Sequence, residues 1–242
     1  MTTKLLSVSL LLNNKKKWAK NLSIQIRNFL INNNIDVLSE SCAQSAQVLI
    51  TIGGDGTILY HKSKFSQPIF AIGSQSSFIC NACEKDWQKK LEPIIKNGFE
   101  TEKRTMLSSW LDNKRLPDAL NEVVIRNREH RILNLRLFLG KKRFVFQADG
   151  ILFSTATGSS AYAYSCGGSE MNPLSKDYQV VAIAPYRRNF SPMIVPSSMT
   201  CEAHVDSTCT ADAVIDGQYE VAVKRKCTLV IKVSKREFLF VR

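Results

Sequence analysis

A short glycine-rich stretch carries the side chain with the clearest chemical potential. In ITIGGDGTIL, at residues 50–59, a single carboxylate, Asp55, stands among glycines that directly follow an apolar run. Glycines at the end of a strand let backbone N–H groups approach an anion closely. An acid beside phosphate makes chemical sense if it accepts or orients the proton of an attacking hydroxyl. The structural alternative is a tight turn in which Asp55 caps the next helix. The predicted phosphate-binding residues are Gly53, Gly54, Gly56 and Thr57.

A second stretch, DGILFSTATGSSAYAYSCGG at residues 149–168, is dense in hydroxyl groups and contains Tyr162. Hydroxyls form hydrogen bonds with sugars and phosphates, small residues permit close approach, and a tyrosine ring can stack on a base. A solvated turn is the alternative, but it explains poorly why Asp149 and a Gly-Gly pair bound the stretch. A third element, ALNEVVI, places Asn121 and Glu122 together at the start of a predicted strand. Such a pair suits ribose hydroxyls or a carboxamide, although a plain strand end remains the alternative.

The residues around these motifs indicate two domains. Residues 1–103 alternate strand-like apolar runs with helix-like patterns, which favours a parallel sheet with helices on both faces. Asn13 or Asn14 is expected to cap the first helix, whose apolar positions include Leu22 and Ile26. Residues 104–242 contain mainly strand-length apolar segments. This second domain is therefore predicted to be mostly antiparallel.

Two glycine-containing pairs in the second domain, Gly140-Lys141 and Asp216-Gly217, are predicted to form hairpin turns. The stretch from Gly158 to Gly168 could hold one short helix.

Charge and composition narrow the range of partners. The 242 residues carry a net charge of +12, from 33 basic and 21 acidic side chains, which favours an anionic partner. Short clusters such as Lys15-Lys16-Lys17 are expected to be mostly solvated surface. No nucleic-acid motif is present, and no apolar run approaches the roughly 18 residues of a membrane span. We therefore expect neither nucleic acid nor a membrane as partner.

The cysteines point to a reducing compartment. Cys80 and Cys83 form one CxxC, but no second pair or histidine pair follows at a zinc-site spacing. The seven cysteines of the chain fit free thiols, so we expect no metal site and a cytoplasmic location.

In this order and spacing, the motifs resemble those of the NAD kinase family. The stretch at 149–168 is the most specific part, because lipid kinases and phosphofructokinases carry similar GGDG loops. The resemblance runs through both halves of the chain, and it implies a Rossmann-like N-terminal α/β domain, a mostly antiparallel β-sandwich-like C-terminal domain, and homodimers or homotetramers. The matching pieces are GGDGT (53–57), RTML (104–107), ALNEVVI (119–125), DGILFSTATGSSAYAYSCGG (149–168) and DGQ (216–218).

The resemblance also implies a reaction and its residues. A phosphoryl group would move from ATP or polyphosphate to the 2′-hydroxyl of the adenosine ribose of NAD, with Asp55 as the general base. A divalent cation such as Mg²⁺ would arrive bound to the donor. The residues that would contact NAD are Gly56, Phe78, Asn121, Glu122, Asp149, Thr157, Ser160, Ala161, Tyr162, Ser165 and Gln218.

The chain departs from the family pattern near the phosphates. Tyr60 stands where a basic residue commonly follows GGDGxxL. Gln147 stands where a basic residue often precedes Asp149 by two positions. The loop at 73–79 is shorter than in the family. These departures keep open a catalytically impaired NAD-binding sensor or a basic nucleic-acid binder. A GGDG-type lipid kinase is the other alternative, but it would need an apolar acyl site, against which the polar stretch at 149–168 argues.

Overall fold

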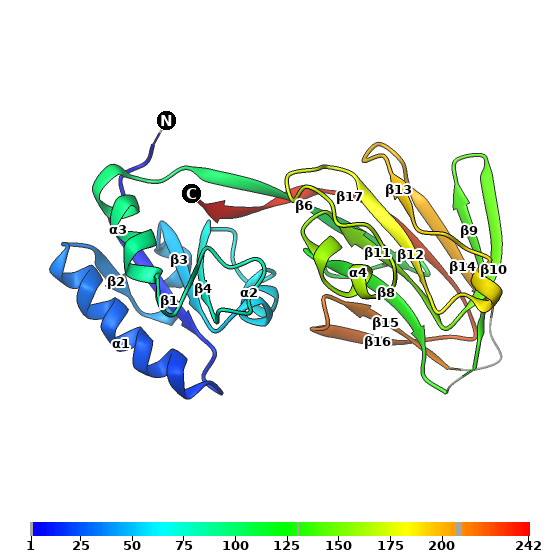
Figure 1. The fold of residues 1–242 in the computed structure, drawn as a ribbon, viewed down its shortest axis with the longest axis horizontal. Coiled ribbons are helices and arrows are strands. Elements are labelled where there is room, and N and C mark those ends of the chain that lie inside the picture. The colour runs from blue at the N-terminus through cyan, green and yellow to red at the C-terminus, as the bar shows by residue number, and fades with distance from the viewer. Residues whose placement is uncertain (1, 130, 207–209) are drawn as a thin grey trace. The chain divides into compact units, whose positions relative to one another are not determined.

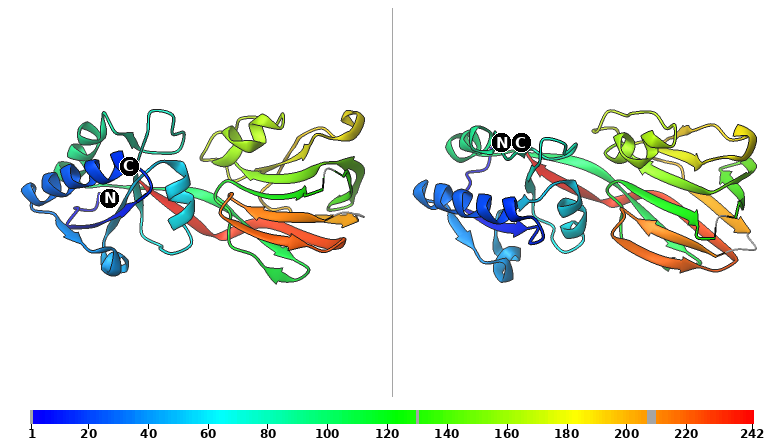
Figure 2. Two further views of the ribbon diagram at one scale, coloured as in Figure 1. Left: turned by 90° about the horizontal axis from the view of Figure 1, so that it is seen from below. Right: turned by 60° about the horizontal axis from the view of Figure 1, so that its bottom comes forward.

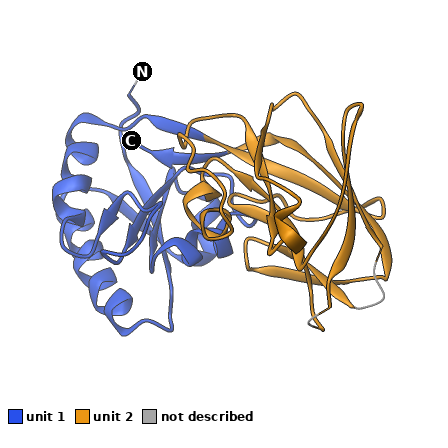
Figure 3. Cartoon of the chain, turned by 45° about the vertical axis from the view of Figure 1, so that its right-hand side comes forward, with its two compact units in different colours: residues 1–103, 238–242 blue, residues 104–237 orange. Residues whose placement is uncertain are grey.

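The described residues of the computed structural model, 2–129, 131–206 and 210–242, fall into two compact units. Unit 1 comprises Met1–Lys103 and Phe238–Arg242, and unit 2 comprises Arg104–Glu237 (Figure 3). The residues from 238 to 242 therefore belong with the first unit, whereas the sequence-based division places them in the second domain. The reason is visible in the backbone, where Glu100 and Arg242 exchange two hydrogen bonds of 2.8 Å.

Unit 1 is built on a parallel sheet with the strand order β4-β3-β1-β2 (Figure 1). All residues of β3 and β4 are buried, as expected for strands covered on both faces. Helices α1 and α3 share one apolar core with the sheet, and the rings of Phe29 and Trp87 meet edge to face with centroids 5.4 Å apart. The elements of this unit are β1 (Ser7–Leu12), α1 (Lys17–Asn32), β2 (Asp36–Leu38), the 3-10 helix η1 (Glu40–Ser45), β3 (Val48–Ile52), α2 (Asp55–His61), β4 (Ile69–Gly73), β5 (Ala82–Cys83) and α3 (Trp87–Asn97).

Helix α1 begins later than the sequence predicts. Its N-cap is Lys16, which makes no side-chain capping bond, so the prediction of an asparagine cap is wrong. Asn13 instead accepts the backbone N–H of Lys15 at 3.1 Å and donates its own backbone N–H to Ile52 at 2.9 Å. Residues 13–16 thus form a separate turn between β1 and α1, bonded to the end of β3. The predicted apolar face of the helix is confirmed by the burial of Leu22 and Ile26.

Unit 2 contains two antiparallel sheets that enclose one core (Figure 2). One sheet has the order β13-β12-β11-β8-β15-β16, and the other includes β10-β9-β14-β17. Alternate residues of β8 and β11, such as Ile125 and Ile151, point into this core together with Leu135 and Leu229 of the facing sheet. Both predicted hairpins are present, β9–β10 and β15–β16. An N-terminal α/β unit followed by a mostly antiparallel unit confirms the predicted fold class.

The bounds of the remaining elements are β6 (Thr101–Leu111), β7 (Lys114–Arg115), β8 (Glu122–Asn127), β9 (Leu133–Leu139), β10 (Lys142–Ala148), β11 (Gly150–Thr155), η2 (Gly158–Ser160), α4 (Tyr162–Ser165), β12 (Tyr178–Ile183), η3 (Tyr186–Arg188), β13 (Met193–Val195), β14 (Cys201–Asp206), β15 (Ala211–Ile215), β16 (Tyr219–Val223) and β17 (Lys226–Val241). Strands β6 and β17 each run from one unit into the other. Across the described residues, every helix is too short or too polar to cross a membrane. The cysteines of the described part are free thiols, and Cys209 lies outside it.

Candidate functional site

The GGDG loop joins β3 to α2 in unit 1, and geometry requires glycine at its first two positions, Gly53 and Gly54. Gly54 has a φ of 103°, in the left-handed region that favours glycine. At Gly53, a Cβ atom would overlap the side chains of Thr57 and Asn13. Thr57 is only 4% exposed, and its Oγ1 has no hydrogen-bond partner among the described residues. An unpaired buried hydroxyl is unfavourable, which makes Thr57 a candidate for a hydrogen bond with a ligand at this loop.

The carboxylate of Asp55 is held by the loop that follows β4. Its Oδ2 accepts the backbone N–H of Phe78 at 2.8 Å, and its Oδ1 accepts the backbone N–H of Ile79 at 3.2 Å and the thiol of Cys80 at 3.3 Å. Gly54 is the N-cap of α2, without a side-chain capping bond, so the capping interpretation of Asp55 is wrong. A carboxylate offers about four acceptor positions, and three contacts leave one for a hydroxyl proton.

Asn121 and Glu122 lie buried at the start of β8 in unit 2, where Asp216 holds the backbone. The carboxylate of Asp216, in the β15–β16 turn, accepts the backbone N–H groups of Leu120, Asn121 and Glu122, each at 2.8 Å. Asn121 Oδ1 and Glu122 Oε2 are buried and lack a hydrogen-bond partner in the described part of the chain. Burial, together with the charge of Asp216, raises the pKa of Glu122 to about 8.

Two buried polar atoms without partners at neighbouring positions are costly in a folded protein. They are therefore candidates for hydrogen bonds with a ligand.

The hydroxyl-rich stretch is locked to the same strand start. Thr155 donates its hydroxyl to the carbonyl of Leu120, and its backbone N–H to that of Asn121 at 2.9 Å. Gly158 packs so closely that a Cβ there would overlap the backbone of Asn121. Thr157 is buried, and its Oγ1 accepts a hydrogen bond from Arg104 at 3.4 Å. The motifs RTML, ALNEVVI and 149–168 therefore meet within unit 2.

Tyr162 begins α4 and faces a pocket with Glu122. The pocket has a volume of about 190 Å³, and its lining includes Tyr162, Glu122, Arg126 and Gly217. Tyr162 is 37% exposed, and partial burial raises the pKa of its hydroxyl. Arg126 lines this pocket although none of the sequence motifs includes it. The period-two pattern of β8 could have found it, because residues 122, 124 and 126 share one face of the strand.

The other predicted residues are less closely grouped. Asp149 is exposed and lies at the opposite end of β11 from the Asn121–Glu122 pair, beside Asn127, whose side chain donates to it at 3.3 Å. Six strand residues span roughly 20 Å, so Asp149 and Glu122 lie too far apart to bind the same group of a ligand. Phe78 is 78% exposed in unit 1. Of the remaining predicted residues in unit 2, Ser160 is half-buried, whereas Ala161, Ser165 and Gln218 are exposed.

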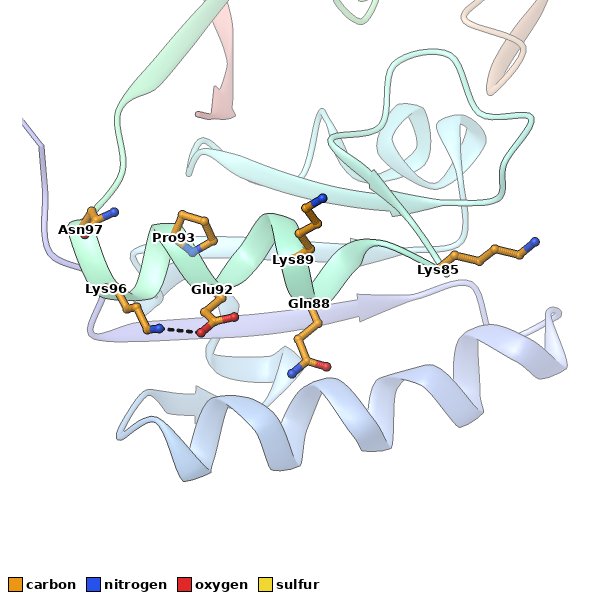
Figure 4. A pocket seen from close by; sticks show the side chains of 7 residues that line it. All are labelled: Lys85, Gln88, Lys89, Glu92, Pro93, Lys96 and Asn97. Carbon is orange, nitrogen blue, oxygen red and sulfur yellow. Dashed lines mark hydrogen bonds and ion pairs between the residues drawn. The ribbon is translucent and has the colours of Figure 1, made fainter.

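A larger hollow, of about 510 Å³, lies along α3 in unit 1 and contains none of the predicted residues (Figure 4). Its charged lining belongs to exposed surface, as in the ion pair of Lys96 and Glu92 at 2.6 Å. Elsewhere in the described residues, no three His, Cys, Asp or Glu side chains come together as metal ligands.

Comparison with known proteins identifies the family. Residues 120–242, half of the chain, match the model of the ATP-NAD kinase C-terminal domain. The chain belongs to the NAD kinase family. Its relatives include the NAD kinase of Methanoregula boonei, 35% identical over 78% of this chain and 71% of the relative. The NAD kinase of Methanothermobacter thermautotrophicus is 30% identical over 93% of this chain and 87% of the relative.

Solved structures of NAD and NADH kinases share the fold of this chain. The yeast NADH kinase solved with NADH aligns with a TM-score of 0.86 and 21% identity, over 99% of this chain and 84% of that one. The NAD kinase of Archaeoglobus fulgidus solved with ATP aligns with a TM-score of 0.83 and 22% identity, over 98% and 94% of the two chains. These comparisons confirm the resemblance to the NAD kinase family that the motifs indicate.

Proposed function

We propose that the chain transfers a phosphoryl group from ATP or polyphosphate to the 2′-hydroxyl of the adenosine ribose of NAD, which yields NADP. The observation that carries this proposal is the pair of buried, unpartnered oxygen atoms on Asn121 and Glu122. Glu122 lines a pocket, Asn121 is its neighbour in the chain, and the curated relatives of this chain are named NAD kinases. Both atoms suit the hydroxyl and amide groups that NAD presents.

The second unit supplies the acceptor site in this proposal. Asn121 and Glu122 bind polar groups of NAD, while Asp216 and Gly158 keep the strand start that carries them in place. Tyr162 covers the same pocket and contacts a ribose or the nicotinamide end. Holding a hydroxyl in line for attack supplies up to about 7–11 kcal/mol in the most favourable case. The further predicted NAD contacts are Gly56, Phe78, Asp149, Thr157, Ser160, Ala161, Ser165 and Gln218.

The first unit supplies the base and the donor site. Asp55 is held by two backbone N–H groups and a thiol and keeps an acceptor position for the proton of the attacking hydroxyl. Removal of that proton contributes on the order of 10²–10⁴-fold to the rate. The backbone of Gly53, Gly54 and Gly56 and the hydroxyl of Thr57 bind the donor phosphates.

Three further properties belong to the proposal. The donor carries a divalent cation such as Mg²⁺, which neutralises phosphate charge. The chain forms homodimers or homotetramers and works in the cytoplasm, as its family resemblance and its free thiols suggest. Light scattering of the purified chain tests the oligomer.

The activity is tested by incubating the purified chain with NAD, Mg²⁺ and either ATP or polyphosphate, and by measuring NADP with an NADP-specific dehydrogenase. We expect NADP that depends on time, enzyme and donor. Tight NAD binding with no NADP from either donor would overturn the proposal in favour of an NAD-binding sensor. Phosphorylation of diacylglycerol instead of NAD would favour a lipid kinase.

A further inference from the structure

Lys16 brings a positive charge to the GGDG loop from a different part of the chain. It stands in the turn between β1 and α1, and its Nζ donates a hydrogen bond of 2.7 Å to the carbonyl of Gly53. The residue is half-buried, unlike its exposed neighbours Lys15 and Lys17. Of the three lysines in this cluster, one is therefore fixed against the predicted phosphate loop, and the other two are solvated.

The absence of a side chain at Gly54 lets Lys16 and Ser77 lie close to the loop backbone. A Cβ at Gly54 would lie 3.7 Å from Lys16 Nζ and 3.1 Å from Ser77 Oγ. The buried, unpartnered hydroxyl of Thr57 lies at the adjacent position, against Gly53. An ammonium and two hydroxyls thus lie against the first two glycines of the loop, and all of these groups can donate hydrogen bonds.

The ammonium of Lys16 has donors left for a ligand. It carries three N–H bonds, and the carbonyl of Gly53 takes one of them. The ion pairs found among the described residues do not include Lys16. Its ring contact with Trp18, at 5.7 Å, leaves the N–H groups available. A partly buried cation without an anionic partner favours an anionic ligand.

We propose that Lys16, supported by Ser77, binds the terminal phosphates of the donor at the GGDG loop. The proposal rests on the proposed function and adds the residue that supplies charge there. Tyr60 carries no charge where a basic residue is common in the family, and Asp55 adds a negative charge to the loop. Lys16 offsets the repulsion between that carboxylate and the donor phosphates. Both candidate donors, a nucleoside triphosphate and a linear polyphosphate, would present a chain of phosphates to Lys16.

The test compares Lys16→Gln and Lys16→Arg with the matched control Lys15→Gln in the full chain. Equilibrium binding of ATP and of polyphosphate is measured without NAD, and KM is measured for each substrate. Loss of a charge-assisted contact is expected to weaken binding of both donors about 10- to 100-fold in Lys16→Gln. Lys16→Arg is expected to recover most of that binding, since it keeps the charge. Lys15→Gln is expected to bind like the wild type, and the KM for NAD is expected to be unchanged in all three.

Ser77→Ala provides a second variant that keeps the charge and removes one hydroxyl. We expect it to weaken donor binding less than Lys16→Gln does, by about fivefold, as for one neutral hydrogen bond. Wild-type donor affinity in Lys16→Gln would overturn the assignment of Lys16. If Lys16→Gln weakened the binding of NAD and of the donor equally and also lowered Tm, the assignment would be overturned in favour of a structural role of Lys16 in holding Gly53. A wild-type chain that binds ATP without forming NADP would overturn only the proposed function, because the binding measurements still decide the role of Lys16.

Discussion

Asp216 Oδ1 accepts the backbone N–H of Glu122 at 2.8 Å, although the two residues are 94 positions apart in the chain. The bond fixes the start of β8 and keeps a negative charge near the carboxyl group of Glu122. Together with burial, this charge raises the pKa of Glu122 to about 8. In the free protein at neutral pH, Glu122 is therefore mostly protonated, and its ionisation is coupled to folding.

The first prediction concerns stability and pH. The unfolded chain loses the Glu122 proton near the ordinary pKa of 4.5, whereas the folded chain keeps it up to about pH 8. The folded state thus binds the additional proton, so this contribution to stability is complete below pH 4.5 and is lost as the pH rises through 8. Glu122→Gln is neutral at every pH and lacks this dependence.

Urea unfolding of the wild type and of Glu122→Gln at several pH values measures the effect. Between acidic and alkaline pH, the wild type is expected to lose stability relative to the variant, by on the order of 3–5 kcal/mol at most. A difference between the two chains that stays constant across the pH range would contradict the raised pKa.

The second prediction concerns Asp216, whose carboxylate holds the backbone at the start of β8. Asp216→Asn exchanges one acceptor oxygen for an N–H donor, so at least one of the backbone N–H groups of residues 120–122 loses its partner. We expect unfolding to become easier by about 1–3 kcal/mol and kcat/KM for NAD to fall at least about tenfold. Donor binding is expected to remain at the wild-type level. Asp112→Asn, which removes a similar contact to the backbone of Thr228, serves as the control.

If Asp216→Asn and its control lowered kcat/KM for NAD equally, Asp216 would have no specific role in placing Asn121 and Glu122.

The third prediction separates the two roles of Asp55. Asp55→Asn cannot accept a proton and places an amide where Phe78 and Ile79 donate, so turnover is expected to fall by on the order of 10²-fold or more. Donor affinity is expected to be unchanged or higher, because a negative charge has been removed from the phosphate loop. Cys80→Ala is the matched control, since it removes one weak contact to the carboxylate and leaves the carboxylate in place.

Single-turnover rates and donor binding isotherms for both variants provide the measurement. Near-wild-type turnover in Asp55→Asn would leave Asp55 only the role of holding the loop at residues 78–80. Equal losses in Asp55→Asn and Cys80→Ala would also show that loop order, and not proton transfer, limits the rate.

The fourth prediction concerns the ring of Tyr162. Because the side chain is 37% exposed at the pocket, Tyr162→Ala is expected to leave Tm nearly unchanged and to weaken NAD binding. Tyr162→Phe keeps the ring and is expected to weaken it less. Isothermal titration with NAD and a thermal melt measure both effects. A large drop in Tm for Tyr162→Ala, with normal NAD affinity in the folded fraction, would make the ring part of the core.

The local pattern of apolar residues in the sequence was sufficient to predict the fold class. Apolar runs that alternate with helical periodicity indicated the parallel sheet of unit 1, and strand-length segments with glycine turns indicated the antiparallel sheets of unit 2. The pattern failed at the start of α1, because Asn13 is a good cap by type but forms hydrogen bonds at the end of β3 instead. Capping preference is a weak local energy, and contacts with a neighbouring strand outweigh it.

The sequence by itself determined which chemical groups the motifs contain, because glycines, a carboxylate and hydroxyls are visible in any fold. Only the tertiary structure decided what those groups touch. It holds Asp55 by residues 78–80, joins Asp216 to Glu122, separates Asp149 from Glu122 along β11, and brings Lys16 to Gly53. These relationships depend on strand register and on the path of loops between distant segments. Periodicity and turn residues describe short segments and predict hairpins between consecutive strands, but they carry no information about which distant segments become neighbours.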